Sequence, residues 1–175
     1  MSDPHGSELP SDWVLRFAGA VPEGGAVLDV AAGRGRHSRL FLERGHPVTA
    51  VDRDLSKLPE APGLEAVEAD LEDGRAFPFL EEEFAAVVVT NYLHRPILPD
   101  IVASVGPEGW LIYETFAQGN AAFGKPSNPD FLLRPGELLD AVRGHLRVVA
   151  YEDRNVVAPR PAAIQRIAAR NEPKE

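Results

Sequence analysis

The feature that most constrains the fold is an apolar run that enters a glycine-rich turn, followed one helix length later by a second apolar run ending in an acid. The first run and its turn are Val27-Leu-Asp-Val-Ala-Ala-Gly-Arg-Gly-Arg-His-Ser38, and the second run is Val48-Thr-Ala-Val-Asp52. This order predicts two parallel strands with a nucleotide-type cofactor lying across their carboxyl ends. The acid at the end of the second strand is expected to hold the ribose hydroxyls.

Asp29 narrows the choice of cofactor. It lies inside the first predicted strand, where a dinucleotide-binding strand is normally apolar throughout. A buried carboxylate is costly unless it meets a cation or several hydrogen-bond donors. A cofactor with an ammonium group supplies such a partner, and S-adenosylmethionine (SAM) has one. Asp29 therefore favours SAM.

Length and composition limit the organisation of the chain. Its 175 residues are 44% apolar, which predicts one domain over residues 1–175, with a flexible N-terminus over 1–11 and a frayed tail over 171–175. No run approaches the roughly 20 apolar residues of a membrane helix, and the start does not resemble a signal peptide. The chain has no cysteine. We therefore expect a cytoplasmic protein with no membrane partner.

Charge and histidine spacing exclude two classes of site. The net charge is −9, and the arginines are scattered among acids. Nucleic acid binding needs a basic face, so no nucleic acid partner is expected. The histidines do not have the spacing of metal ligands, and thiolate ligands are absent, so no metal is expected. The sequence does not specify an oligomeric state.

Strand and helix patterns alternate along the chain. Strands are predicted at about 26–31, 48–52, 64–69, 84–90, 109–115, 146–153 and 162–169, and helices at about 13–17, 36–44, 97–105 and 135–142. The run 84–90 is almost wholly apolar, as a central parallel strand should be, whereas 64–69 alternates with acids, as at a sheet edge. The pattern predicts an open α/β sheet with a terminal antiparallel addition.

A long irregular stretch covers residues 116–134 and is rich in Gly, Asn, Pro and Phe. A loop of that length in a small domain is usually functional. It leaves a strand at the same edge as the glycine turn, so it is predicted to be a substrate-facing lid. Its candidate substrate contacts are Phe116, Asn120, Phe123 and Lys125.

Four segments resemble the cofactor motifs of the class I SAM-dependent methyltransferases. They are Leu28-Asp-Val-Ala-Ala-Gly-Arg-Gly35, Val51-Asp52, Val67-Glu-Ala-Asp-Leu71 and Thr90-Asn-Tyr-Leu93. The resemblance spans about 26–115, with Ala31 at a position where the family usually has glycine. Among subfamilies, Phe131-Leu-Leu-Arg-Pro-Gly-Glu-Leu138 is similar to a segment of small tellurite-resistance-type and related bacterial methyltransferases of unassigned substrate.

The resemblance implies a fold, an activity and a set of cofactor contacts. The fold is a Rossmann-like three-layer α/β sandwich, whose mostly parallel seven-stranded sheet has a C-terminal antiparallel strand. The activity is SAM-dependent methyl transfer to a small-molecule or peptide-like acceptor, including a protein side chain. Asp29 is expected on the cofactor's ammonium, Asp52 on the ribose and Asp70 on the adenine amine. The expected cofactor-binding residues are Asp29, Ala31, Gly33, Gly35, Asp52, Arg53, Asp70, Leu71, Asn91 and Arg16.

Tyr92 and His94 are the candidate catalytic residues, because they follow the fourth strand at the carboxyl edge of the sheet. A hydroxyl or protonated amine acceptor needs a base, and an unperturbed histidine has a suitable pKa near 6.5. A soft or already deprotonated acceptor needs none. The alternative interpretation is that neither residue takes part in proton transfer and both line the pocket. In either case, Tyr92 is also expected to contact the substrate. Whether His37 reaches the pocket or is a partly exposed residue of the first helical turn is also open. Arg16 either binds the carboxylate of the cofactor or is a solvated surface charge.

Two rival functions remain. Gly33-x-Gly35-x-x-Ser38 imitates the fingerprint of NAD(P)-dependent oxidoreductases but has Ser where a third Gly or Ala belongs, and Asp29 is misplaced for that class. The second rival is a non-catalytic SAM-binding or regulatory partner protein. The acids at positions 29, 52 and 70 support cofactor binding in either SAM-based interpretation.

Overall fold

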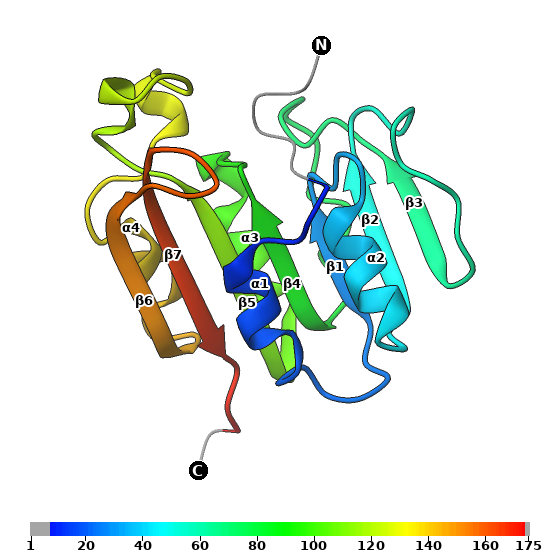
Figure 1. Ribbon diagram of the computed structural model, residues 1–175. Helices are drawn as coiled ribbons and strands as arrows, with labels where there is room; N and C mark the ends of the chain where they lie inside the picture. The colour runs from blue at the N-terminus through cyan, green and yellow to red at the C-terminus, as the bar shows by residue number, and fades with distance from the viewer. Residues whose placement is uncertain (1–7, 174–175) are drawn as a thin grey trace.

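A seven-stranded sheet with the order β3-β2-β1-β4-β5-β7-β6 forms the centre of the structure, a computed structural model that describes residues 8–173 (Figure 1). Strands β1 to β5 pair in parallel, and β7 runs antiparallel to both β5 and β6. The strands are β1 (Val27–Val30), β2 (Val48–Asp52), β3 (Leu64–Glu68), β4 (Phe84–Thr90), β5 (Val105–Phe116), β6 (Arg147–Val156) and β7 (Ala162–Arg170). The predicted fold class, a mostly parallel sheet with a C-terminal antiparallel strand, is confirmed.

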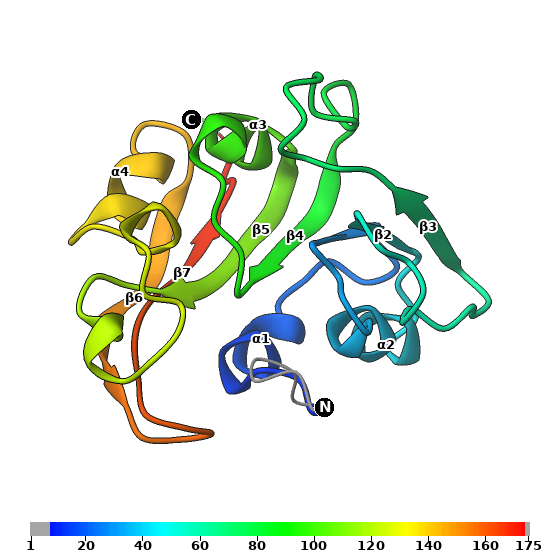
Figure 2. The same cartoon turned by 90° about the horizontal axis from the view of Figure 1, so that it is seen from above.

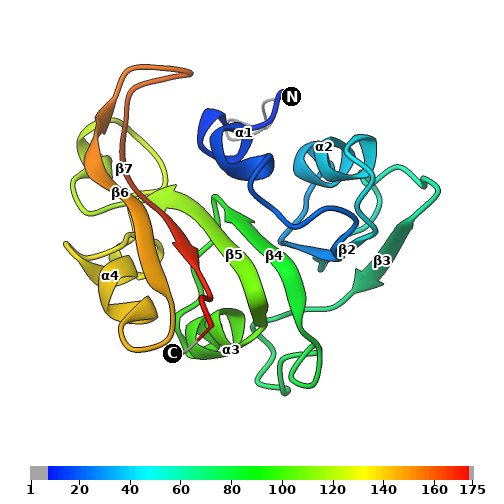
Figure 3. The ribbon, with the colours of Figure 1, turned by 90° about the horizontal axis from the view of Figure 1, so that it is seen from below.

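Helices cover both faces of this sheet and complete three layers. Figures 2 and 3 show α1 (Asp12–Ala18) and α2 (Arg36–Glu43) on one face, and α3 (Leu98–Ala103) and α4 (Glu137–Val142) on the other. Three short 3-10 turns, η1 (Arg95–Ile97), η2 (Asn120–Ala122) and η3 (Pro129–Phe131), lie in the connections. The stretch 55–62 forms no helix, as its prolines predict.

The core is divided by the sheet into two apolar clusters. Successive residues of a strand point to opposite faces, so a strand buried on both faces is apolar at every position. In β4, Val87 packs on the α3 and α4 side, and Val88 packs on the side of α1 and α2. Strand β3, by contrast, lies at the sheet edge and is largely exposed, as its alternating acids predict.

Several element boundaries differ from the sequence prediction. Strand β5 begins at Val105 instead of 109, because the chain re-enters the sheet through an irregular segment in which Glu108 has φ +64°. Gly109 is required there, since a Cβ would lie 2.7 Å from the Phe84 carbonyl oxygen. Helix α4 begins after Gly136 (φ +74°), so Pro135 precedes the helix instead of opening it.

The ends of the chain are only partly described. Residues 1–7 of the predicted flexible N-terminus and 174–175 of the predicted tail lie outside the described residues. Asn171 is not frayed: its side chain donates to the Val105 carbonyl and its backbone pairs with Glu108 and Gly109. Over residues 8–173, no helix combines the length and apolar character needed to cross a membrane.

Candidate active site

A cavity of about 630 Å³ lies at the carboxyl ends of the central parallel strands. Its wall has three parts: the β1–α2 turn, the loops that follow β2 and β3, and the segments that follow β4 and β5 together with the long loop. The lining residues, in that order, are Ala31, Ala32, Gly33, Arg34, Arg36 and His37; Asp52, Arg53, Ala69, Asp70, Leu71 and Glu72; and Thr90, Asn91, Tyr92, Leu93, Thr115, Phe116, Pro126 and Phe131.

The turn after β1 forms the floor of the cavity. Ala31 (φ +54°) and Gly33 (φ +57°) both adopt left-handed backbone, which costs little for glycine and more for alanine. A Cβ built on Gly33 would meet no atom within 4 Å, so this residue leaves open space where a ligand can approach the backbone. Gly35 does not line the cavity. A Cβ at this position would lie 2.5 Å from Leu58 Cδ1, so glycine is needed here to let Leu58 pack against the turn.

Asp52 connects the turn to the strand beside it. Its Oδ2 accepts a hydrogen bond from the Gly33 amide at 2.8 Å, and its Oδ1 accepts from the Asp54 amide at 3.0 Å. Asp70 follows the neighbouring strand β3, and its Oδ1 accepts from the Glu72 amide at 2.9 Å. Each carboxylate retains lone pairs for a ligand, and the two acids mark the β2–β3 end of the cavity.

Asp29 lies beneath the turn instead of on the cavity wall. Its side chain is 3% exposed, and its Oδ2 accepts from the Ser38 hydroxyl at 2.7 Å. Burial raises the pKa of Asp29 to about 6, although the hydrogen bonds from Ser38 oppose that rise. Asp29 does not line the cavity, and its expected contact with a cofactor ammonium stays a prediction. Through Ser38, its carboxylate holds the turn and the start of α2 together.

Of the two candidate bases, Tyr92 lines the cavity and His94 does not. His94 lies off the cavity wall, with Nδ1 3.5 Å from a Glu72 carboxylate oxygen. Tyr92 lines the cavity, and its hydroxyl is buried without a hydrogen-bond partner within residues 8–173. Burial, followed by the charge of Glu72, raises the pKa of Tyr92 above its ordinary value. The phenol therefore stays protonated at neutral pH and is poorly suited to accept a proton.

His37 lines the cavity, which settles an alternative that the sequence left open. It is 2% exposed; its Nε2 accepts from the Ser11 amide at 3.0 Å, and its Nδ1 lies 3.4 Å from Thr90 Oγ1. Burial and the charge of Arg36 lower the pKa of His37 to about 3. The imidazole is therefore neutral, and Nδ1 carries its proton toward Thr90. His37 is a fixed polar group of the wall.

Among the substrate contacts expected from the long loop, Phe116 lines the cavity, whereas Phe123 and Lys125 are exposed outside it. Asn91, which follows β4 and was expected at the cofactor, also lines the cavity. Asn120 is 1% exposed and structural, because its side chain accepts from the Ala163 amide and donates to the Pro126 carbonyl.

Pro126 and Phe131, which sequence reasoning missed, face the cavity instead. No periodic pattern marks either of them, since the loop is irregular.

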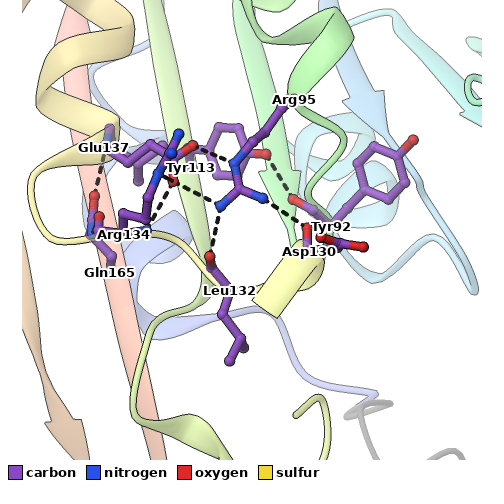
Figure 4. A network of polar contacts seen from close by, with 9 residues as sticks. Tyr92, Arg95, Tyr113, Asp130, Leu132, Arg134, Glu137 and Gln165 are labelled. Atoms are coloured by element: carbon purple, nitrogen blue, oxygen red, sulfur yellow. Dashed lines mark hydrogen bonds and ion pairs between the residues drawn. The ribbon is translucent and has the colours of Figure 1, made fainter. Parts of the chain in front are cut away.

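Arg95 anchors this loop to the segment that follows β4 (Figure 4). Its guanidinium forms a bidentate pair with the Glu137 carboxylate, at 2.8 and 2.9 Å. It also donates to the carbonyls of Asp130 (3.0 Å) and Leu132 (2.8 Å), on either side of Phe131. The loop is thus fixed against α4 and η1, with Phe131 held at the cavity.

Arg16, expected on the cofactor's carboxylate, lies elsewhere. It is exposed on α1, and its guanidinium lies over the rings of Trp13 and Phe17, at 5.5 and 5.1 Å from their centroids. Trp13 is a buried core residue. The cations on the cavity wall are instead Arg34, Arg36 and Arg53. Across residues 8–173, no group of three or more His, Asp or Glu is arranged to hold a metal ion.

Comparisons with known proteins agree with this architecture. Residues 27–106 match the family described as "Methyltransferase domain". Demethylmenaquinone methyltransferase from Renibacterium salmoninarum is 31% identical over 113 residues, which cover 59% of this chain and 46% of that protein. The aligned region thus spans less than half the length of this curated relative.

Solved structures share the fold. TehB from Haemophilus influenzae has a TM-score of 0.70 at 16% identity, covering 96% of this chain and 64% of that one. The 1,6-didemethyltoxoflavin-N1-methyltransferase of Burkholderia thailandensis, solved with 1,6-didemethyltoxoflavin and S-adenosylhomocysteine bound, has a TM-score of 0.64 at 22% identity, covering 92% and 76%. Identities this low show the fold alone. Taken with the domain matched over residues 27–106, the strand order and the glycine turn, they show that the chain has the Rossmann-like fold of SAM-dependent methyltransferases.

Proposed function

We propose that this chain binds SAM in the cavity at the carboxyl ends of β1, β2 and β4, and transfers its methyl group to a small-molecule or peptide-like acceptor. The observation that carries the proposal is the arrangement of Gly33, Asp52 and Asp70 around one cavity. An open glycine turn lies beside two carboxylates that follow adjacent parallel strands. This arrangement suits a nucleoside whose ribose and base lie across the strand ends. We further propose one domain over residues 1–175 and a cytoplasmic location.

The residues of the cavity fit the cofactor by chemistry as well as by position. Asp52 can accept the ribose hydroxyls, and Asp70 can accept the adenine amine. Leu71 and Tyr92 supply an apolar wall beside them. Gly33 has no side chain, so it leaves open space beside the backbone for the methionine portion of the cofactor. A sulfonium ligand has no phosphate, so this turn need not bind an anion.

The acceptor is expected at the other end of the cavity, near β4 and β5. The side chains there are neutral: His37, Thr90, Asn91, Thr115, Phe116, Pro126 and Phe131. When bound, the cofactor supplies a methyl group already activated on a sulfonium sulfur. The protein then has to align the acceptor for in-line displacement, which can lower a barrier by roughly 7–11 kcal/mol. A neutral wall favours an acceptor that is soft or already deprotonated.

Calorimetry with SAM, S-adenosylhomocysteine and NAD tests the proposal. We expect micromolar binding of the two adenosyl ligands and none of NAD. Binding of NAD alone would favour an oxidoreductase. Binding of SAM without transfer of labelled methyl to any acceptor pool would instead favour a non-catalytic partner protein.

Asp52→Ala is expected to weaken binding of S-adenosylhomocysteine about tenfold, or about 1.4 kcal/mol, because hydrogen bonds to the ribose are lost. Calorimetry measures the change directly. Asp73→Ala is the matched control, since Asp73 is outside the cavity. Within residues 8–173, its carboxylate accepts from the Arg75 amide and forms an ion pair with the Arg75 side chain. Equal affinities for wild type and Asp52→Ala would place the ribose elsewhere.

His94→Ala is expected to leave methyl transfer and its pH dependence within twofold of wild type, because the imidazole lies beside Glu72 and off the cavity wall. The measurement is release of S-adenosylhomocysteine between pH 6 and 9 with an acceptor pool. A large drop in turnover, with cofactor affinity retained, would restore His94 as the general base.

A further inference from the structure

A partly buried arginine begins α2 on the wall of the cavity. The Nη1 atom of Arg36 donates to the Leu9 carbonyl at 3.0 Å. Burial lowers the pKa of Arg36, while the charges of Glu114 and Asp29 oppose that change. Within residues 8–173, neither carboxylate accepts a hydrogen bond from Arg36. Asp29 accepts from Ser38, and Glu114 accepts from Ser11 and Arg166. The guanidinium therefore keeps donors available for a further anionic partner.

The segment Leu9–Ser11 is docked on the same wall. Besides the Leu9 contact, the Ser11 amide donates to His37 Nε2 at 3.0 Å, and the Ser11 hydroxyl donates to Glu114 Oε1 at 2.8 Å. Ser11 also caps α1, whose position next to α2 is visible in Figure 2. Two adjacent cavity residues, Arg36 and His37, thus hold the chain that leads into α1.

Sheet order fixes which end of the cofactor reaches Arg36. Asp52 and Asp70 mark the nucleoside end beyond β2 and β3, and β1 and then β4 come next across the sheet. A ligand that extends from the ribose toward β4 passes the start of α2. The amino-acid tail of SAM, which ends in a carboxylate, would be the part that lies there. A planar guanidinium fork matches a carboxylate in charge and geometry.

We propose that Arg36 binds the carboxylate of the cofactor while it holds the Leu9 carbonyl, so that cofactor binding and docking of Leu9–Ser11 reinforce each other. The inference rests on the proposed function. Arg36 acts here as a cofactor-binding residue and as a positioning residue for the N-terminal segment. A ligand without the amino-acid tail occupies the nucleoside end without this linkage.

Two ligands and four variants, Arg36→Gln, Arg36→Lys, Arg34→Gln and Arg39→Gln, test the assignment by calorimetry. The ligands are S-adenosylhomocysteine and 5′-methylthioadenosine, which lacks the amino-acid tail. Arg36→Gln is expected to lower affinity for S-adenosylhomocysteine roughly twentyfold and to leave 5′-methylthioadenosine within twofold. Arg36→Lys keeps the charge but loses the planar guanidinium fork, so its affinity for S-adenosylhomocysteine should lie between those of the wild type and Arg36→Gln. Arg39→Gln is the matched control, because Arg39 is exposed on the same helix and off the cavity.

Hydrogen exchange on the wild-type chain tests the linkage without any substitution. S-adenosylhomocysteine is expected to slow amide exchange in α1 and its cap at least threefold, and 5′-methylthioadenosine is expected not to. Equal slowing by both ligands, or by neither, would overturn the linkage. Equal loss of both affinities in Arg36→Gln, no loss, or a loss confined to Arg34→Gln, would overturn the assignment of Arg36. Failure of the wild type to bind either ligand would reject the proposed function itself, and this inference with it.

Discussion

Arg95→Met is expected to lower the free energy of unfolding by about 3 kcal/mol. The substitution keeps most of the apolar stem but removes four hydrogen bonds, two of them to the Glu137 carboxylate. Glu137 is 11% exposed at its side chain, so its charge would lose its main partner in a poorly solvated position. Removing one member of such a pair costs more than the pair itself contributes. Urea unfolding at neutral pH measures the change.

The exposed pair of Arg143 and Asp140 provides the control. It has a similar N–O distance, 2.9 Å, but its side chains are 77% and 69% exposed. Arg143→Met should therefore change stability by less than about 0.5 kcal/mol. If the two variants lost equal stability, burial of Glu137 would not be the cause. Arg95→Met should also speed amide exchange at Phe131 and Leu132, whereas a loss of stability spread evenly over the chain would contradict the anchoring role.

The strands of the sheet could be predicted because their signal is local. Strand β4 is apolar along its length and is buried on both faces, and β3 alternates with acids at an edge. The turn between β1 and α2 has its own glycine signature. The start of β5 could not be predicted, because a bulge and the positive φ of Glu108 follow from pairing with β4.

The nucleoside end of the cavity was also predictable, and the other end was not. Asp52 and Asp70 follow adjacent parallel strands, so topology alone brings them to one edge. The acceptor side depends on contacts distant in sequence: Arg95 and Glu137 are 42 positions apart, and Ser11 and Glu114 are 103 apart. No spacing rule indicates which aromatic of an irregular loop faces inward. Phe131 was therefore missed, and Asn120, in fact a buried brace, was expected on the substrate.

Asp29→Asn is expected to stabilise the ligand-free chain above pH 6 by about 2–3 kcal/mol. The pKa of Asp29 is raised by burial from 3.8 to about 6, so the folded state holds this proton more tightly than the unfolded state does. A group with a raised carboxyl pKa contributes its full stability below the unfolded value and loses it as pH rises through the folded value. The difference between 3.8 and about 6 corresponds to about 3 kcal/mol. Asparagine is isosteric, stays neutral, and keeps an oxygen that can accept from Ser38.

Urea unfolding of wild type and Asp29→Asn between pH 4 and 8 measures this dependence. The stability difference should be smallest near pH 4, grow between pH 4 and 6, and stay constant above that range. Asp153→Asn, at an exposed position of edge strand β6, should show no such growth. A difference independent of pH would mean that Asp29 titrates alike in both states, and its burial beneath the turn would then carry no electrostatic cost. With the expected result, the charge at position 29 weakens the fold at neutral pH, and the hydrogen bond from Ser38, which joins the glycine turn to α2, does not offset that cost.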